Sequence, residues 1–161
     1  MVSTASAAAL DELVREIEDP ELPHVTIGDL GIVRSVTVHG ATATIVLTPT
    51  YTGCPATEQI RDDVTVAVER AGYAPIVRME MSPAWTTDWI SERGRQRLHA
   101  AGIAPPSAVD ANGATVVEPP ASCPRCTSRK TRRVSQFGGT ACKASYACIA
   151  CGEPFELFKA L

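Results

Sequence analysis

The sequence predicts an α/β (α+β) fold: a small mixed three-stranded sheet covered by helices, followed by a small cysteine-rich β domain. Three observations support this prediction. In the first hundred residues, β-branched runs alternate with amphipathic helical stripes. Five of the six cysteines lie in the last 39 residues, and two Pro-Pro pairs precede them. We therefore expect an α/β domain at residues 1–102, a proline-rich linker at 103–122 and a cysteine-bound domain at 123–161.

The first predicted elements are a helix and a hairpin. Apolar residues at helical spacing precede Pro20, where the helix must have ended; they are Leu10, Leu13, Val14 and Ile17. The β-branched runs at 32–40 and 41–50 meet at His39-Gly40, which is typical of a hairpin. We therefore expect two antiparallel strands after a proline-containing loop.

A helix and a third strand follow the hairpin. The second apolar stripe begins after Cys54-Pro55 and ends at Gly72, the usual position of a helix-terminating glycine. Residues 75–81 alternate as a strand, which should return parallel because a strand–helix–strand unit almost always does. Residues 86–102 predict a shorter third helix with Thr86 or Thr87 as its N-cap.

Composition restricts the class of protein. Hydrophobic residues make up 45% of the 161 residues and charged residues 20%, which is typical of a globular chain. No apolar run is long enough to span a bilayer, and the N-terminus lacks the basic region of a signal peptide. We therefore expect a cytoplasmic protein without membrane contacts, whose grouped thiols bind metal rather than form disulfides.

Two Cys-x-x-Cys pairs predict a metal site in the C-terminal domain. The segment is too short for an apolar core alone, so four thiolates around Zn²⁺ would supply the missing folding energy. The expected ligands of this four-cysteine zinc ribbon are Cys123, Cys126, Cys148 and Cys151. Iron also accepts four sulfurs, so it remains the alternative metal. The fifth thiol, Cys142, is either a buried core cysteine or an additional participant in the metal chemistry.

Charge is divided unevenly between the two domains. From Cys123 onward there are seven basic and two acidic residues, whereas the first 122 residues carry a net charge of −8. Four cations cluster in the ribbon: Arg129, Lys130, Arg132 and Arg133. Aromatic residues do not interleave with them, so nucleic-acid binding receives little support. We expect a solvated face or a surface for an acidic protein partner.

Cys54 is the only cysteine of the first domain, and it stands where a strand gives way to a helix. If the helix begins at Pro55, Cys54 is its N-cap, and the unpaired N–H groups there favour a reactive, metal-binding thiolate. A buried structural cysteine is the alternative. His24 is the one histidine that could serve as a neighbouring base, and Asp29 could orient a ligand or cap its own loop.

Several motifs in combination resemble a known family. "DPELPHVTIGDLGIVRSV", "VLTPTYTGCPA" and the closing "CPRC…FGGTACKASYACIACGEPFELFK" are similar to the PaaD family, accessory proteins encoded with the phenylacetyl-CoA ring epoxidase. Residues from about 8 to 100 resemble the wider iron–sulfur assembly family that includes SufT. The resemblance implies a reactive, cluster-handling cysteine at Cys54. It also implies supporting positions in the matching motifs, at Asp19, Glu21, Asp29 and Thr50, and metal ligands at the four ribbon cysteines.

The resemblance implies a maturation role in phenylacetate catabolism, in which the chain helps an iron–sulfur or di-iron component of the multicomponent monooxygenase become active. The expected partners are oxygenase and reductase subunits and the iron–sulfur assembly machinery. One thiol cannot ligate a cluster alone, so a homodimer or ligands from the client are required. Relatives often carry a further C-terminal cysteine where this chain has Ala160, so Cys142 lacks that partner here. The competing functions are a structural oxygenase subunit, a thiol enzyme and a nucleic-acid-binding ribbon.

Overall fold

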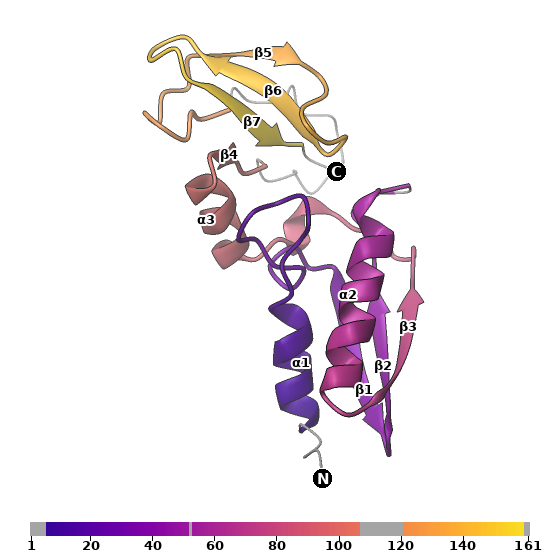
Figure 1. Ribbon diagram of the computed structural model, residues 1–161. Coiled ribbons are helices and arrows are strands. Elements are labelled where there is room, and N and C mark those ends of the chain that lie inside the picture. Colours follow the sequence, from indigo (N-terminus) through magenta and orange to yellow (C-terminus); the bar gives the residue numbers. More distant parts are fainter. Residues whose placement is uncertain (1–5, 52, 107–120, 160–161) are drawn as a thin grey trace. The chain divides into compact units, whose positions relative to one another are not determined.

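The computed structural model describes residues 6–51, 53–106 and 121–159 (Figure 1). The chain forms two compact units, Met1–Trp85 and Thr86–Leu161. No helix of the described residues is long and apolar enough to cross a membrane. Most of the expected linker, residues 107–120, lies outside the described part of the chain.

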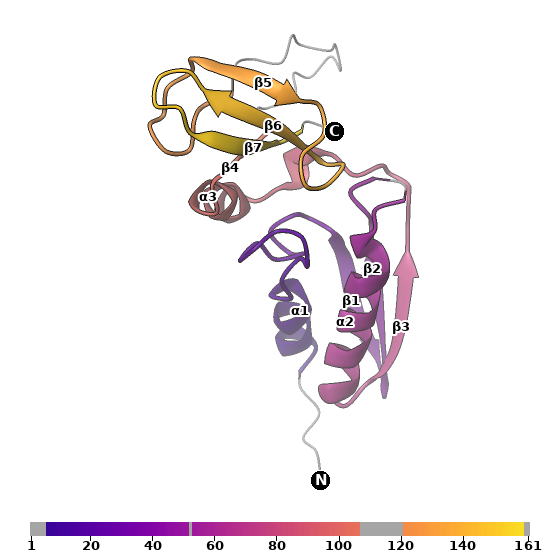
Figure 2. The same cartoon turned by 45° about the horizontal axis from the view of Figure 1, so that its top comes forward.

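The first unit contains the mixed sheet that the sequence predicts. β1 (Val33–His39) pairs antiparallel with β2 (Thr42–Leu47), and β2 pairs parallel with β3 (Ala74–Met79), in the order β1-β2-β3. α1 (Ala7–Arg15) and α2 (Ala56–Arg70) lie on one face of this sheet (Figures 1 and 2). The predicted hairpin, crossover helix and parallel third strand are therefore confirmed.

Alternation along β2 explains which face the helices cover. Ala43, Ile45 and Leu47 are fully buried, whereas the residues between them are half-buried on the opposite face. Because successive strand side chains point to opposite faces, one face of the sheet packs against α1 and α2. Each large apolar side chain buried there stabilises the unit by about 1.5–3 kcal/mol.

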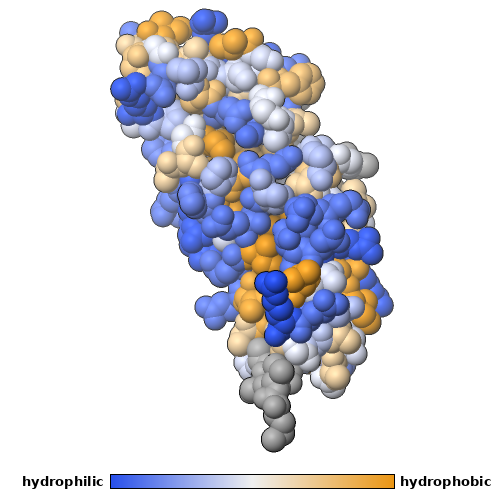
Figure 3. Space-filling model, in the orientation of Figure 1, coloured by the Kyte–Doolittle hydropathy of each residue, from blue (hydrophilic) through white to orange (hydrophobic). Residues whose placement is uncertain are grey.

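The predicted stripe of the first helix is only partly correct. Leu10 and Val14 are fully buried, but Leu13 is 42% exposed and the helix ends at Arg15. Val66 on α2 is exposed to the same extent as Leu13. Figure 3 shows one face of the molecule as mainly hydrophilic, with apolar residues in smaller patches. Scattered apolar residues of this kind are ordinary on a protein surface.

The loop between α1 and β1 is held by long-range hydrogen bonds. Trp85 Nε1 donates to the carbonyl oxygen of Leu30 over 2.7 Å, and Glu18 pairs with Thr26 as an isolated bridge. Gly28 approaches the backbone so closely that a Cβ there would lie 2.5 Å from the carbonyl oxygen of Arg15. Only glycine can lie this close to the last residue of α1, so Gly28 lets the loop pack against the end of the helix.

The second unit begins earlier than the sequence predicts. It contains a 3-10 turn, η1 (Thr87–Trp89), then α3 (Glu92–Ala100), and a four-stranded sheet in the order β4-β7-β6-β5. Its strands are β4 (Ile103–Ala104), β5 (Thr131–Ser135), β6 (Lys143–Cys148) and β7 (Pro154–Phe158).

Two sequence expectations need correction here. The helix starts at Glu92, and its N-cap is Ser91, whose hydroxyl accepts from the Gly94 N–H, rather than Thr86 or Thr87. The domain boundary also differs from residue 102, because β4 pairs parallel with β7 and so joins the ribbon's sheet. A two-residue strand beside a Pro-Pro pair carries no recognisable pattern, which is why the sequence predicts a linker from there on.

Candidate functional site

Two turns of the same shape present the four ribbon cysteines. In the first, the Thr127 N–H donates to the Cys123 carbonyl oxygen over 2.8 Å, and in the second, the Gly152 N–H donates to that of Cys148 over 3.0 Å. The residue after each Cys-x-x-Cys motif has a positive φ, 60° at Thr127 and 78° at Gly152. These turns form two knuckles that carry two sulfurs each.

The four sulfurs converge on one centre. Cys123 and Cys151 Sγ are 3.8 Å apart, Cys126 and Cys148 Sγ are 3.6 Å apart, and all four lie within 4.8 Å of one another. A tetrahedron with metal–sulfur bonds of about 2.3 Å has edges of about 3.8 Å. The donor set therefore fits a single tetrahedral metal ion, and the predicted four-cysteine cluster is confirmed.

Hydrogen bonds and crowding divide the protons unequally among these thiols. The pKa of Cys148 is lowered to about 7, mainly because the Cys151 backbone N–H donates to its sulfur. The Ser128 backbone N–H acts to lower the pKa of Cys126, but the Cys151 thiol, desolvation and the remaining thiols together raise it to about 12. Four sulfurs at this spacing cannot all be thiolates unless a cation compensates their charge.

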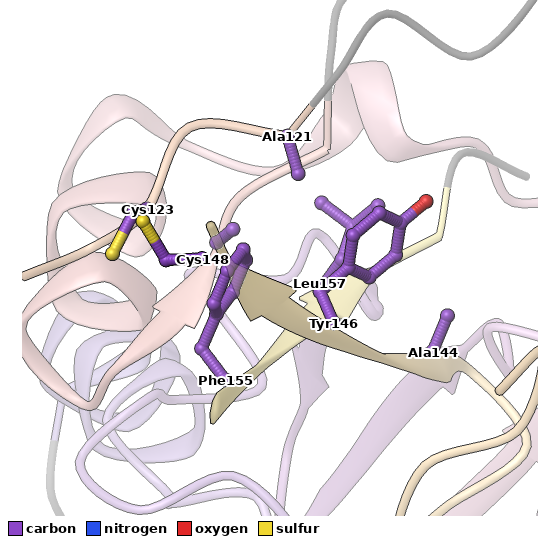
Figure 4. Close-up of a cluster of buried hydrophobic side chains, with 8 residues drawn as sticks. Ala121, Cys123, Ala144, Tyr146, Cys148, Phe155 and Leu157 are labelled. Atoms are coloured by element: carbon purple, nitrogen blue, oxygen red, sulfur yellow. The ribbon is translucent and has the colours of Figure 1, made fainter. Parts of the chain in front are cut away.

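The metal centre is continuous with the apolar core of the ribbon. Cys123 and Cys148 are buried, and Figure 4 shows both beside Phe155 in the cluster that also contains Tyr146 and Leu157. Tyr146 and Phe155 stack with ring centroids 5.8 Å apart. The other two ligands of the predicted site are exposed. A bound ion would therefore tie both knuckles to a core that is small for its length.

Cys142 lies outside the group of four. Its side chain is 6% exposed, and its sulfur is 3.0 Å from the Thr140 hydroxyl oxygen. Its carbonyl oxygen accepts from the Lys159 N–H. Of the two roles that the sequence leaves open for Cys142, its burial fits a core cysteine rather than a participant in the metal chemistry.

Cys54 stands at a partly open corner of the first unit. Gly53 has a φ of 82°, and a Cβ there would meet nothing within 4 Å, so the turn requires glycine for its backbone alone. The predicted helix start is one residue early: Pro55 has αR dihedrals and occupies the N-cap position, and α2 begins at Ala56. The Thr57 N–H donates to the Cys54 carbonyl oxygen three residues earlier, so a tighter turn precedes the helix.

The Cys54 side chain is half-buried and lines a small pocket. The pocket volume is only about 20 Å³, room for about one water molecule. An iron–sulfur cluster could contact the thiol only at the mouth. The lining residues come from the loop between α1 and β1, the segment between β2 and α2, α2 itself and β3. They are Asp19, Ile32, Pro49, Thr50, Cys54, Thr57, Ile60 and Met79.

The other candidate residues divide into two groups. Asp19 and Thr50 line the pocket with Cys54, and Asp19 is 9% exposed and accepts from the Glu21 N–H over 2.8 Å. Asp29 and His24 do not line it. Asp29 is 1% exposed and exchanges hydrogen bonds with Thr26, so it caps its own loop.

His24 projects away from the core. Its side chain is 85% exposed, its φ is 62°, and its Nδ1 is 3.8 Å from the Glu18 carboxylate. The structure thus does not bring a histidine to Cys54 in the described part of the chain. Sequence reasoning also missed Thr57 and Met79 as pocket residues; the first was detectable, because Thr57 lies one helical turn beyond Cys54.

A buried ion pair in the ribbon was likewise not foreseen. The Lys143 side chain is only 8% exposed, and its Nζ is 2.7 Å from Glu156 Oε2. The other carboxylate oxygen accepts from the Gly139 N–H over 2.6 Å. Although desolvation acts to raise the pKa of Glu156, the Gly139 N–H and Lys143 outweigh it and lower that pKa.

Comparisons with known proteins identify the lineage. The model of the PaaD zinc beta ribbon domain matches residues 107–159, and that of an iron-sulfur cluster assembly protein matches residues 7–73. The chain is 45% identical to a putative 1,2-phenylacetyl-CoA epoxidase subunit of Escherichia coli (strain K12), over 92% of this chain and 90% of that protein. The chain belongs to the PaaD family.

Two further relatives each match little more than half of this PaaD-family chain. It is 34% identical to an "Fe-S protein maturation auxiliary factor" of Porphyromonas gingivalis (strain ATCC BAA-308 / W83), over 53% of this chain and 84% of that protein. A crystal structure of a "Domain of Unknown Function DUF59" from Bacillus anthracis aligns with a TM-score of 0.53 and 29% identity. It covers 57% of this chain and 90% of that one. The α/β unit therefore has the DUF59 fold.

Proposed function

We propose that this protein is an accessory factor of phenylacetate catabolism that assists iron–sulfur or di-iron cofactor assembly in the phenylacetyl-CoA epoxidase complex. The observation that carries the proposal is the half-buried Cys54, which lines a pocket with Asp19 and Thr50 in a chain of the PaaD family. Its kinship with an iron–sulfur maturation factor and an epoxidase subunit supports both halves of the proposal.

Iron, alone or in a cluster, is the cargo in this proposal. The Cys54 thiolate would take it at the pocket mouth, and the Asp19 carboxylate could contribute a harder oxygen ligand. These groups leave the coordination sphere incomplete, so the client subunit or a second copy of this chain would supply the rest. A weakly held ion is suited to transfer.

The ribbon has a separate role in the proposal. We assign zinc to its four cysteines, because the site is closed by four protein sulfurs and leaves no open position for chemistry. The ribbon is thus a structural clip whose surface contacts oxygenase or reductase subunits, with the assembly machinery acting at Cys54. We place the protein in the cytoplasm, because its grouped free cysteines suit a reducing compartment.

A structural subunit of the epoxidase complex is the second candidate, supported by the name of the E. coli relative. Co-expressing the oxygenase with Cys54→Ser separates the two, and Cys142→Ala serves as the control because Cys142 is also outside the metal site. The proposed role predicts a folded Cys54→Ser protein and a cofactor-poor, inactive oxygenase. Full cofactor occupancy, with stable co-purification at fixed stoichiometry, would instead establish the structural subunit.

A further inference from the structure

β5 is the edge strand of the ribbon's sheet. It pairs antiparallel with β6 on one side and has no strand on its other side among the described residues (Figures 1 and 2). A bulge between Arg133 and Ser135 interrupts this pairing. An edge strand presents backbone N–H and C=O groups that a further extended chain can pair with.

The positive charge of the ribbon is concentrated along this edge. The two carboxylates of the ribbon are occupied elsewhere: Glu153 lies 2.6 Å from Arg125, and Glu156 lies 2.7 Å from Lys143. Three cations, at positions 129, 130 and 132, are exposed and have no ion pair in the described part of the chain. The excess cations therefore flank or belong to a single strand.

Apolar side chains stand beside these cations. Val134 is 57% exposed, and Phe137, two residues beyond the strand, is 62% exposed. Lys159 Nζ lies 4.9 Å from the centroid of the Phe137 ring and 3.4 Å from the Gln136 carbonyl oxygen. The edge of the sheet thus presents a further cation and two apolar side chains in addition to the three exposed cations.

Backbone hydrogen bonds fix the turn that carries Phe137. The Phe137 N–H donates to the Ser135 hydroxyl, the Gly138 N–H to the Lys143 carbonyl oxygen, and the following amide to Glu156. A Cβ on Gly138 would lie 2.5 Å from Glu156 Oε1, so a larger residue there would displace the carboxylate that holds this turn. The backbone that carries the exposed ring is therefore fixed, and a preorganised contact favours binding.

We propose that the β5 edge binds an extended acidic segment of a partner protein, which adds to the sheet as a fifth strand. Backbone pairing would supply affinity, carboxylates would face the cations, and apolar side chains would contact Val134 and Phe137. The same charges discourage pairing between two basic β5 edges. This inference deepens the docking role proposed for the ribbon and depends on that function only for the partner's identity, because Cys54 takes no part.

An NMR titration of the full-length, zinc-loaded protein tests the proposal. The probe is a synthetic decapeptide of alternating Glu and Val, and the amides of residues 131–137 are followed. We expect shift changes at these residues, slower hydrogen exchange along β5, and a dissociation constant that rises with salt. Arg132→Glu should weaken binding on the order of fivefold, whereas Arg61→Glu, the same charge change on the exposed surface of α2, should leave it unchanged.

Further measurements distinguish this proposal from its alternatives. The same peptide with every backbone nitrogen methylated keeps its charges but has no backbone N–H left to donate along either edge, so it should not bind. Absence of shifts at β5, equal binding of the methylated peptide, or equal loss in Arg61→Glu would overturn the proposal.

Tighter binding of single-stranded DNA at the same residues would assign the edge to nucleic acid. Salt-sensitive self-association abolished by Arg132→Glu would assign it to a second copy. Loss of peptide binding in Cys54→Ser would contradict the independence of the two sites, while its retention leaves the assembly role to be tested separately.

Discussion

The ion pair between Lys143 and Glu156 is asymmetric, and this asymmetry predicts unequal costs for losing its two partners. The Lys143 side chain is 8% exposed, whereas that of Glu156 is 31% exposed. Glu156→Gln keeps an oxygen for the Gly139 N–H but leaves the lysine ammonium without its counter-charge. Lys143→Met removes the ammonium, retains an apolar stem and leaves a carboxylate that water can reach.

The magnitudes follow from burial. Breaking a fully buried pair by removing one partner costs about 3–5 kcal/mol, because the remaining charge is uncompensated. Since water reaches the Glu156 side, and the lysine can shift toward it, we expect Glu156→Gln to cost about 2–3 kcal/mol. Lys143→Met should cost about 1 kcal/mol or less, because the surviving carboxylate keeps its hydrogen bond and part of its hydration.

Urea unfolding of the zinc-loaded protein measures these costs, with hydrogen exchange in β6 and β7 reporting on the ribbon alone. The free energy of unfolding of the double variant should be close to that of Lys143→Met, because without the lysine ammonium the Glu156 carboxylate has no charge to compensate. Equal costs for the two single variants, or additive costs in the double variant, would refute the reasoning from burial.

Three other predictions concern the ribbon. Chelation of the metal should unfold residues 121–159, with loss of hydrogen-exchange protection there and retention in β1–β3; protection that survives chelation would contradict a metal-dependent core. Gly152→Ala should destabilise the zinc-loaded ribbon by about 1–2 kcal/mol, because φ is 78° while a Cβ would meet nothing within 4 Å; Thr127→Gly is the matched change in the other knuckle and should not destabilise it. The pKa of Glu156 is lower in the folded state, so its contribution is complete above its ordinary pKa of about 4.5 and is lost as pH falls through the folded value. The stability gap between wild type and Glu156→Gln should therefore narrow below about pH 4.5, and a gap that stays constant throughout acid titration would be inconsistent with this shift.

Local periodicity was sufficient to predict the first sheet. The alternation in β2, the helical stripe of α2 and the stop at Gly72 each depend on residues close in sequence, and all three are found. The convergence of the four ribbon sulfurs was also predictable, because each Cys-x-x-Cys pair is a local motif and a tetrahedral ion takes four ligands.

Features that depend on long-range contacts were not predictable in this way. β4 has only two residues and exists through its pairing with β7. Asp29 was expected either to orient a ligand or to cap its own loop; it is buried and exchanges hydrogen bonds with Thr26. The Lys143–Glu156 pair joins residues of neighbouring strands and leaves no local signal. Whether Cys54 would be sealed or reachable was likewise a matter of tertiary packing.

The central claim is that Cys54 accepts iron while the ribbon cysteines hold a separate ion. Anaerobic reconstitution with ferrous iron and sulfide, followed by metal analysis and visible absorption, tests it most directly. The account predicts that the wild-type protein gains iron and colour while retaining one zinc per chain, and that Cys54→Ser retains the zinc but gains neither. Equal iron uptake by the Cys54→Ser variant, or iron that binds only by displacing the zinc, would contradict it.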